Sequence, residues 1–176
     1  PNSAQRRSFP IPVIADPGYS AAKGAAMNDT TKYIAKGSAH VKLAPETEPL
    51  SVTFVLLPKF TMLAFSSAIE PLRIANQLTG QVLFRWQVLS DDGGPVACSN
   101  GVPVMVDGPW ADARPEGLIL VCSGVEPEDK ASPALGDWLR GLWRRGRVVG
   151  GLCTGAYALA AAGILKGHRF TMHWDN

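Results

Sequence analysis

The sequence has few cysteines, no long apolar run and no marked excess of charge of either sign. Its three cysteines, Cys98, Cys122 and Cys153, are widely spaced and form no CxxC pair. Neither a disulfide framework nor a structural zinc site is therefore expected, and we predict no metal and no cofactor. Unpaired cysteines fit a reducing cytoplasm. No stretch approaches the roughly 18 uninterrupted apolar residues of a membrane-spanning helix, so we expect no membrane contact.

The charge balance excludes nucleic-acid binding through the domain surface as a whole. There are 17 Lys and Arg residues against 15 Asp and Glu, a net charge of +2, whereas domains that bind nucleic acids directly carry basic patches. Hydrophobic residues make up 46% of the 176 positions. That content excludes a chain disordered throughout and suffices for one domain with a sizeable core.

The two ends of the chain carry different signals from its middle. Residues 1–49 have no periodic apolar face and are predicted to be a flexible leader, with Met27 as a possible true start. The part of the leader before Met27 contains no secretory h-region. Residues 50–176 are predicted to form one domain. Because Asn176 directly follows a predicted strand, we expect this domain to be incomplete at its C-terminus.

Strand and helix signals alternate between these ends. Apolar runs predict strands, and apolar residues at helical spacing predict helices. The expected strands are 51–58, 83–90, 117–124, 148–153 and 169–176, with a hairpin at 95–107 and helices at 62–78, 134–146 and 154–165. This order predicts an α/β sandwich with a mainly parallel sheet. Ligands of such sheets bind at the carboxyl ends of the strands.

The strongest chemical motif is Gly151-Leu152-Cys153-Thr154-Gly155, between an apolar strand and an Ala-rich helix. It has the pattern of a nucleophile elbow with a cysteine in the nucleophile's place. Glycines two residues to either side leave room for the strained turn. The start of the helix and the N–H of Thr154 could then stabilise a thiolate or an oxyanion. The alternative is an inert buried cysteine before a tightly packed helix.

Two segments carry a resemblance to a known family. Residues 151–174 and 54–76 are similar to the ThiJ/PfpI superfamily, within the class I glutamine amidotransferase-like fold. More narrowly, they resemble the GlxA-type branch of AraC/XylS transcriptional regulators. The resemblance implies a flavodoxin-like three-layer sandwich, often dimeric, that senses a small metabolite and precedes a helix-turn-helix module. Regulators of this type often respond to quaternary-amine or amino-acid catabolites.

The resemblance also implies site residues. Cys153 falls on the elbow cysteine, and Glu70 falls on an acidic residue that reaches toward this thiol in many members. Ser123 and Gly124 fall on an oxyanion turn, whose N–H groups would complete an anion site together with Thr154.

The sequence departs from the catalytic members at two positions. Thr154 follows the cysteine where the protease-like members have a histidine. Ala64 stands where the isonitrile hydratase branch has an aspartate. His173 matches a histidine common among the regulators and could supply a base or a ligand contact. Trp174 beside it is expected at the pocket edge, as part of a site for a cation, whereas packing is the better interpretation of the other tryptophans.

We therefore predict the N-terminal effector-sensing domain of an AraC-family regulator. It would bind an amino acid or quaternary amine at Cys153, form a homodimer, and reach DNA only through a C-terminal helix-turn-helix module that this chain lacks. One alternative is a ThiJ/PfpI-type hydrolase, hydratase or amidase with Cys153 as nucleophile and Glu70 and His173 as its partners. Another is a redox sensor in which Cys153 oxidises reversibly. Incomplete catalytic partners make the enzyme the weaker of these hypotheses.

Overall fold

The computed structural model describes residues 48–113 and 115–172. The predicted leader, except for its last two residues, lies outside the described residues, as do His173 and Trp174. None of the helices described is long and apolar enough to cross a membrane.

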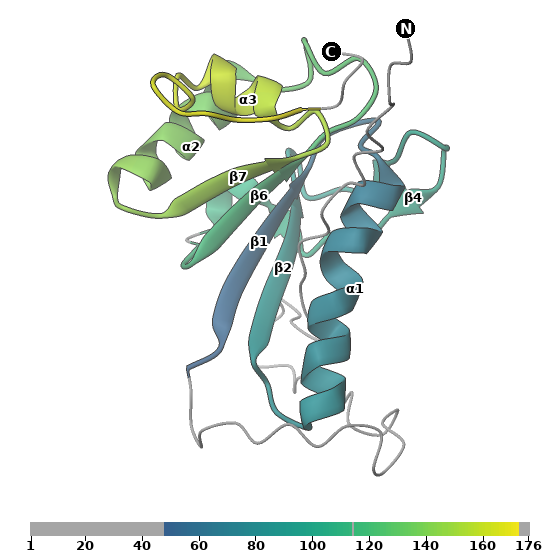
Figure 1. The fold of residues 1–176 in the computed structure, drawn as a ribbon. Coiled ribbons are helices and arrows are strands. Elements are labelled where there is room, and N and C mark those ends of the chain that lie inside the picture. Colours follow the sequence, from purple (N-terminus) through teal and green to yellow (C-terminus); the bar gives the residue numbers. More distant parts are fainter. Residues whose placement is uncertain (1–47, 114, 173–176) are drawn as a thin grey trace, which may run out of the picture.

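A five-stranded sheet forms the centre of the domain, and all of its pairings are parallel. The strand order is β5-β2-β1-β6-β7 (Figure 1). The strands are β1 (Leu50–Leu56), β2 (Phe84–Ser90), β5 (Gly108–Pro109), β6 (Leu118–Cys122) and β7 (Val148–Leu152). The predicted α/β fold with a mainly parallel sheet is confirmed.

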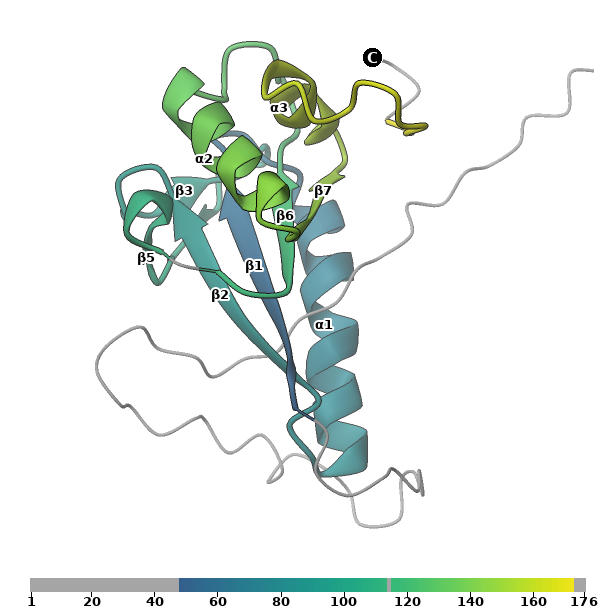
Figure 2. The same cartoon turned by 90° about the vertical axis from the view of Figure 1, so that its left-hand side faces the viewer.

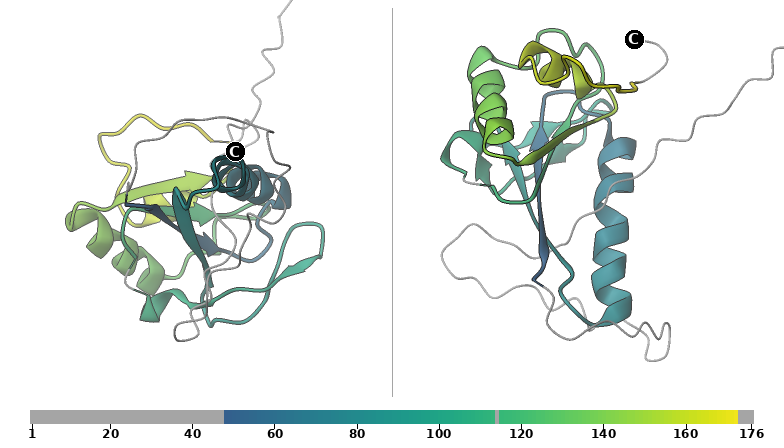
Figure 3. Two further views of the ribbon diagram at one scale, coloured as in Figure 1. Left: turned by 90° about the horizontal axis from the view of Figure 1, so that it is seen from below. Right: turned by 60° about the vertical axis from the view of Figure 1, so that its left-hand side comes forward.

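Helices lie on both faces of this sheet. They are α1 (Met62–Thr79), α2 (Pro133–Arg144), α3 (Ala156–Ala161) and the short 3-10 helix η2 (Trp110–Asp112). Figure 2 shows α1 on one side of the sheet and α2 on the other, and the views in Figure 3 agree. Three layers result, as expected.

Alternation along β1 explains why both faces are buried. Successive side chains of a strand point to opposite faces. Val52, Phe54 and Leu56 pack in the cluster that contains α1, whereas Val55 packs in the cluster that contains α2 and α3. A strand buried on both faces is a continuous apolar run, which is why the sequence revealed it.

The predicted hairpin is also present. Strands β3 (Val96–Ala97) and β4 (Pro103–Val104) pair antiparallel, and Gly101 adopts φ 86° in the connecting turn. The hairpin is tied to the loop before α1, where the N–H of Lys59 donates to the carbonyl of Ala97. It thereby helps to fix the loop that enters the site described below.

Two predicted elements at the C-terminal end differ from the structure. The strand expected over 169–176 does not form at residues 169–172, and the rest of it lies outside the described residues. The helix expected over 154–165 is only the six residues of α3, because Thr154 and Gly155 form the turn before it. An apolar pattern alone does not make a strand, because a strand also needs a partner strand. Strand β7 pairs with β6 and with no other described strand.

The tryptophans within the described region mostly pack, as predicted. Trp86 and Trp110 are buried. The rings of Trp110 and Trp138 lie 5.5 Å apart, and the Trp110 indole donates to the Asp91 carboxylate at 2.8 Å.

Candidate functional site at the carboxyl edge of the sheet

Three loops meet where β1, β6 and β7 end. Two hydrogen bonds join the loop after β1 to the loop after β6. The N–H of Thr61 donates to the Ser123 carbonyl at 3.3 Å, and the N–H of Val125 donates to the Lys59 carbonyl at 3.1 Å. Parallel strands place their carboxyl ends at one edge, so these loops and the turn after β7 form one surface.

The turn after β7 holds Cys153 in the left-handed region, at φ 53°. This conformation costs a residue with a Cβ about 1–2 kcal/mol. A Cβ on Gly151 would lie 2.7 Å from the carbonyl carbon of Gly155, and a Cβ on Gly155 would overlap the carbonyl oxygen of Val121. The predicted elbow and its requirement for both glycines are confirmed.

Backbone strain is concentrated at this edge. Within the described residues, only Lys59, Glu126 and Cys153 have positive φ without being glycine, with φ values of 61°, 55° and 53°. They belong to the three different loops of the edge. Strained residues persist where the surrounding structure holds them in place, which is common at binding and catalytic sites.

The Cys153 thiol contacts a hydroxyl that the sequence interpretation missed. Thr61 Oγ1 lies 3.3 Å from Cys153 Sγ. No other side chain among the described residues forms a hydrogen bond with this thiol. Thr61 lies in the loop after β1 and immediately precedes α1, and its place just past the carboxyl end of a strand was the signal that could have identified it. A hydroxyl can hold the thiol in place but cannot take its proton as a base.

Thr154 connects two of the loops. Its hydroxyl donates to the Gly124 carbonyl at 2.7 Å, and its side chain is buried. The backbone N–H of Thr154 donates no hydrogen bond within the described residues. A Cβ on Gly124 would lie 2.8 Å from Thr61 Oγ1, so this glycine is needed for the close approach of the loops.

Ser123 brings an unsatisfied polar group to the same edge. The residue is 2% exposed, and its hydroxyl has no hydrogen-bond partner among the described residues. Buried polar groups nearly always have partners, so an exception calls for an explanation such as a ligand or a water molecule. The structure thus gathers Cys153, Thr154, Ser123 and Gly124 at one edge.

Glu70 does not join them. Its carboxylate forms an ion pair with Arg73 at 2.7 Å, and its side chain is 53% exposed. It follows Thr61 by nine residues, which is about 13 Å along a helix axis at 1.5 Å per residue. The structure therefore keeps Glu70 away from the thiol. The other two predicted site residues, His173 and Trp174, lie outside the described residues.

The sequence pattern of the DJ-1/PfpI family matches residues 51–176. The chain belongs to the DJ-1/PfpI family. Among curated relatives, this DJ-1/PfpI domain is 48% identical over 122 residues to the HTH-type transcriptional regulator CdhR of Pseudomonas aeruginosa, covering 69% of this chain and 36% of the relative. It is 41% identical over 130 residues to the HTH-type transcriptional regulator GlxA of Rhizobium meliloti, covering 71% and 39%. The chain thus spans little more than a third of these regulators' length.

Other similarities bear on the regulator hypothesis and on the enzyme hypothesis. The structure of an AraC family transcriptional regulator from Pseudomonas putida matches with a TM-score of 0.64 and 30% identity, covering 72% of this chain and 68% of that one. An isonitrile hydratase of Pseudomonas putida is 31% identical over 127 residues, covering 71% of this chain and 53% of the relative. The resemblance to GlxA-type regulators is confirmed for this DJ-1/PfpI domain.

The pKa values of one thiol and one carboxylate near the site are shifted in opposite directions. Burial raises the pKa of the Cys122 thiol far above its usual range, so this neighbour of Ser123 stays protonated. At the edge of the site, Lys59 Nζ lies 2.5 Å from a Glu126 carboxylate oxygen. This lysine, more than any other group, lowers the pKa of Glu126.

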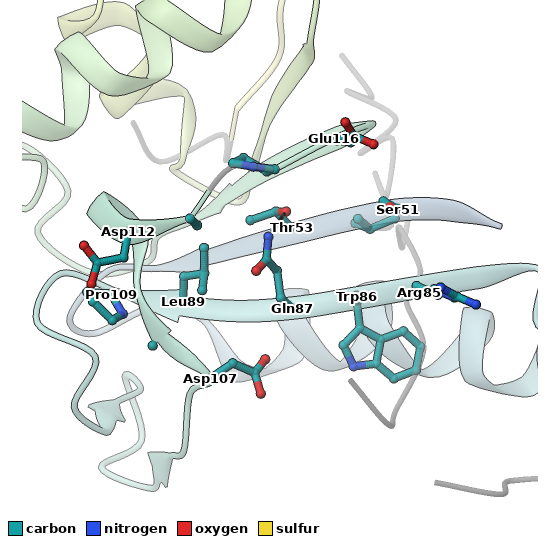
Figure 4. A pocket seen from close by; sticks show the side chains of 14 residues that line it. Ser51, Thr53, Arg85, Trp86, Gln87, Leu89, Asp107, Pro109, Asp112 and Glu116 are labelled. Carbon is teal, nitrogen blue, oxygen red and sulfur yellow. Dashed lines mark hydrogen bonds between the residues drawn. The ribbon is translucent and has the colours of Figure 1, made fainter. Parts of the chain in front are cut away.

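Two cavities lie elsewhere in the DJ-1/PfpI domain. One, of about 520 Å³, lies over β1 and β2 and is lined by Thr53, Gln87 and Arg85, among others (Figure 4). The other, of about 460 Å³, lies between β7 and residues 164–171. Cys153 lines neither cavity. No group of three or more His, Cys, Asp or Glu side chains in the described residues could hold a metal ion.

Proposed function

We propose that this chain is the effector-sensing domain of an AraC-type transcriptional regulator. Its effector would be an amino acid or a quaternary amine with a carboxylate, bound at the edge formed by Cys153, Thr61 and Ser123. The relatives that are HTH-type regulators support this assignment. The observation that carries it is that, among the described residues, the side chain that contacts the Cys153 thiol is the hydroxyl of Thr61 and not a base.

This observation supports a receptor more than a hydrolase. A cysteine nucleophile needs a positioned base or another group that activates it. Here Thr61 offers a hydroxyl, and the hydroxyl of Thr154 is committed to the Gly124 carbonyl. The same groups are suited to bind a polar molecule, because hydroxyl and N–H groups recognise polar atoms without any proton transfer.

Two donors support a carboxylate as the group that is recognised. Within the part of the chain that the structure describes, the buried Ser123 hydroxyl has no partner and the N–H of Thr154 makes no hydrogen bond. A bound carboxylate would accept from both and would remove the cost of leaving a buried polar group unsatisfied.

The effector would act on DNA binding through the remainder of the regulator. The proposed edge combines loops after three different strands, so a ligand there can favour one arrangement of these loops over another. Coupling free energies between two sites are typically about 1–3 kcal/mol. In this proposal the regulator is a cytoplasmic homodimer, and a helix-turn-helix module outside this chain contacts DNA.

Thermal shift and calorimetric titration test this function with amino acids, glycine betaine and carnitine as probes. A ligand that binds only the folded state at 100 times its Kd adds about 2.7 kcal/mol of stability. We expect one of these compounds to raise the Tm of the wild type and of Ser66→Ala, but not that of Ser123→Ala. Ser66 is the control because its hydroxyl bonds to carbonyls within α1. A panel without any stabilising compound, or equal stabilisation of all three proteins, would contradict the proposal.

A cysteine-dependent hydratase is the second candidate function. It is favoured by the strained, partly exposed Cys153 and by the isonitrile hydratase relative. The test is turnover of a simple isonitrile by the wild type and by Cys153→Ala. Product formation that disappears in the variant would favour this function, and absence of turnover in both proteins would exclude it for that substrate.

A further inference from the structure

An exposed ion pair joins two of the loops that form the proposed effector edge. Lys59, in the loop after β1, places its Nζ 2.5 Å from Oε2 of Glu126, in the loop after β6. Lys130 Nζ lies 3.5 Å from the same oxygen. The side chains of Lys59 and Glu126 are 49% and 60% exposed, so a molecule in solution can reach both while the domain stays folded.

The pair is rooted close to the groups that are proposed to bind the effector. A Cβ on Gly124 would overlap the carbonyl oxygen of Lys59 and would lie 2.8 Å from Thr61 Oγ1, so both of these atoms border one position in the loop after β6. Glu126 follows Ser123 by three residues, and three extended residues span at most about 10 Å. The carboxylate of Glu126 is therefore near the Ser123 hydroxyl along the same loop.

Stability does not explain why two strained residues carry this pair. Lys59 and Glu126 have φ values of 61° and 55°, a region that is unfavourable for residues with a Cβ. Ion pairs exposed to water add little stability, because water screens the two charges. The backbone of Lys59 is nevertheless held from both sides, because its N–H donates to the Ala97 carbonyl at 2.9 Å and its carbonyl accepts from the Val125 N–H at 3.1 Å. Strain that the surrounding structure maintains in this way is concentrated at ligand-binding and catalytic sites.

We propose that Glu126 recognises the cationic nitrogen of the effector, and that Lys59 occupies the place of this nitrogen in the free domain. The inference rests on the proposed function, in which the carboxylate of the effector binds at Ser123 and at the N–H of Thr154. On binding, the nitrogen of the effector replaces Lys59 Nζ beside the carboxylate. The lysine ammonium returns to water, which solvates it strongly. One ion pair is thus exchanged for another, and no charge is left buried without a partner.

The charge of Glu126 suits this role. Lys59, and to a smaller extent Lys130, lower the pKa of the Glu126 carboxyl by hydrogen bonding and by their positive charge, so it is ionised at neutral pH. A carboxylate favours a ligand with a positive nitrogen over a ligand of the same shape without that charge. Such selection is a difference between two binding free energies, which matched pairs of ligands measure directly.

Two ligand pairs test the role of Glu126. Glycine betaine has the shape of 3,3-dimethylbutanoate, L-alanine has nearly that of 2-methylpropanoate, and in each pair only the first compound carries a positive nitrogen. In calorimetric titrations of the wild type, we expect a Kd about tenfold lower for the zwitterion of at least one pair. Glu126→Gln is expected to abolish that preference. Glu128→Gln is the matched control, because Glu128 is exposed in the same loop and belongs to no ion pair among the described residues.

The outcomes separate this inference from the proposed function. If the wild type binds a zwitterion and Glu126→Gln keeps the full preference, or if Glu128→Gln loses it equally, the inference is overturned and the proposed function stands. The same holds if the wild type binds both members of each pair equally. If neither zwitterion binds to the wild type, the proposed function fails for these effectors and the inference fails with it. Circular dichroism verifies that each variant is folded.

Lys59→Met tests the exchange of one cation for another. The variant keeps a long side chain and removes the charge that competes for Glu126. We expect the Kd of the zwitterion to fall about threefold or more, and the Kd of its uncharged-nitrogen analogue not to fall. A purely structural role of Lys59 predicts weaker binding of both compounds in this variant. Unchanged or weaker binding of the zwitterion would overturn the exchange.

Discussion

The hydrogen bond from Thr154 to Gly124 joins the turn after β7 to the loop after β6. We therefore predict that removing it lowers the stability of the domain. Thr154→Val replaces the hydroxyl by a methyl group of similar size, so the change in packing is small. The Gly124 carbonyl, which accepts at 2.7 Å in the wild type, would lose its donor at a site where Thr154 is only 2% exposed. A buried acceptor without a partner costs about 1–3 kcal/mol.

The assay is urea unfolding followed by far-UV circular dichroism, with thermal unfolding in parallel. A loss of about 1–3 kcal/mol would lower the Tm by roughly 4 °C per kcal/mol for a domain of this size. The matched control is Thr154→Ser, which keeps the hydroxyl and loses a methyl group. We expect Thr154→Ser to be more stable than Thr154→Val. A valine variant as stable as the wild type, or more stable than the serine variant, would refute the assigned role of the hydrogen bond.

Three further predictions concern strain, titration and thiol chemistry. Gly155→Ala, whose Cβ would overlap the Val121 carbonyl, should lose more stability in urea than Gly101→Ala, which has open space and only a positive φ of 86° to overcome; equal losses would contradict the steric account. Burial raises the pKa of Asp107, so its folded form binds the proton more tightly than its unfolded form, and stability should fall as the pH rises from the ordinary carboxyl pKa through the raised one. Asp107→Asn should flatten that part of the stability–pH profile, and an unchanged profile would exclude Asp107 as its source. Iodoacetamide should modify Cys153 before Cys98 and Cys122, both of which are buried, as peptide mass spectrometry would show; early labelling of Cys122 would contradict its burial.

Much of the fold could be predicted from sequence because the signals were local. The strands β1 and β6 are apolar runs buried by the sheet itself, and Gly151 reflects a contact with Gly155, a close neighbour in the chain. The strand expected over 169–176 does not form at residues 169–172, because a strand exists only if another backbone pairs with it. The sequence pattern cannot show whether such a partner is present.

The site was predicted less completely because its contacts join distant segments. Thr61 and Cys153 are 92 residues apart, and no spacing rule connects a threonine before one helix to a cysteine before another. Glu70 was expected at the thiol by resemblance, but its place on α1 directs it to Arg73. A match of residue type at one position does not fix the direction of a side chain.

The sheet order has a consequence for how the domain folds. Strands β1 and β2 are joined through α1, which brings Leu50 opposite Phe84. Strands β6 and β7 are joined through α2, which brings Leu118 opposite Val148. The pairing of β1 with β6, as between Val52 and Leu118, must close a much longer stretch of chain than either of these. Closing the longer loop is slower and has a larger entropic cost, so two strand-helix-strand units can form before they join each other.

The contact between Thr61 and Cys153 crosses the junction between these two units. Each unit alone carries only one of the two side chains, so neither a folding intermediate nor a separated half can present the complete site. A ligand could therefore bind at this edge only after both units have joined. Any fluctuation that parts β1 from β6 would remove the binding surface before either half unfolds.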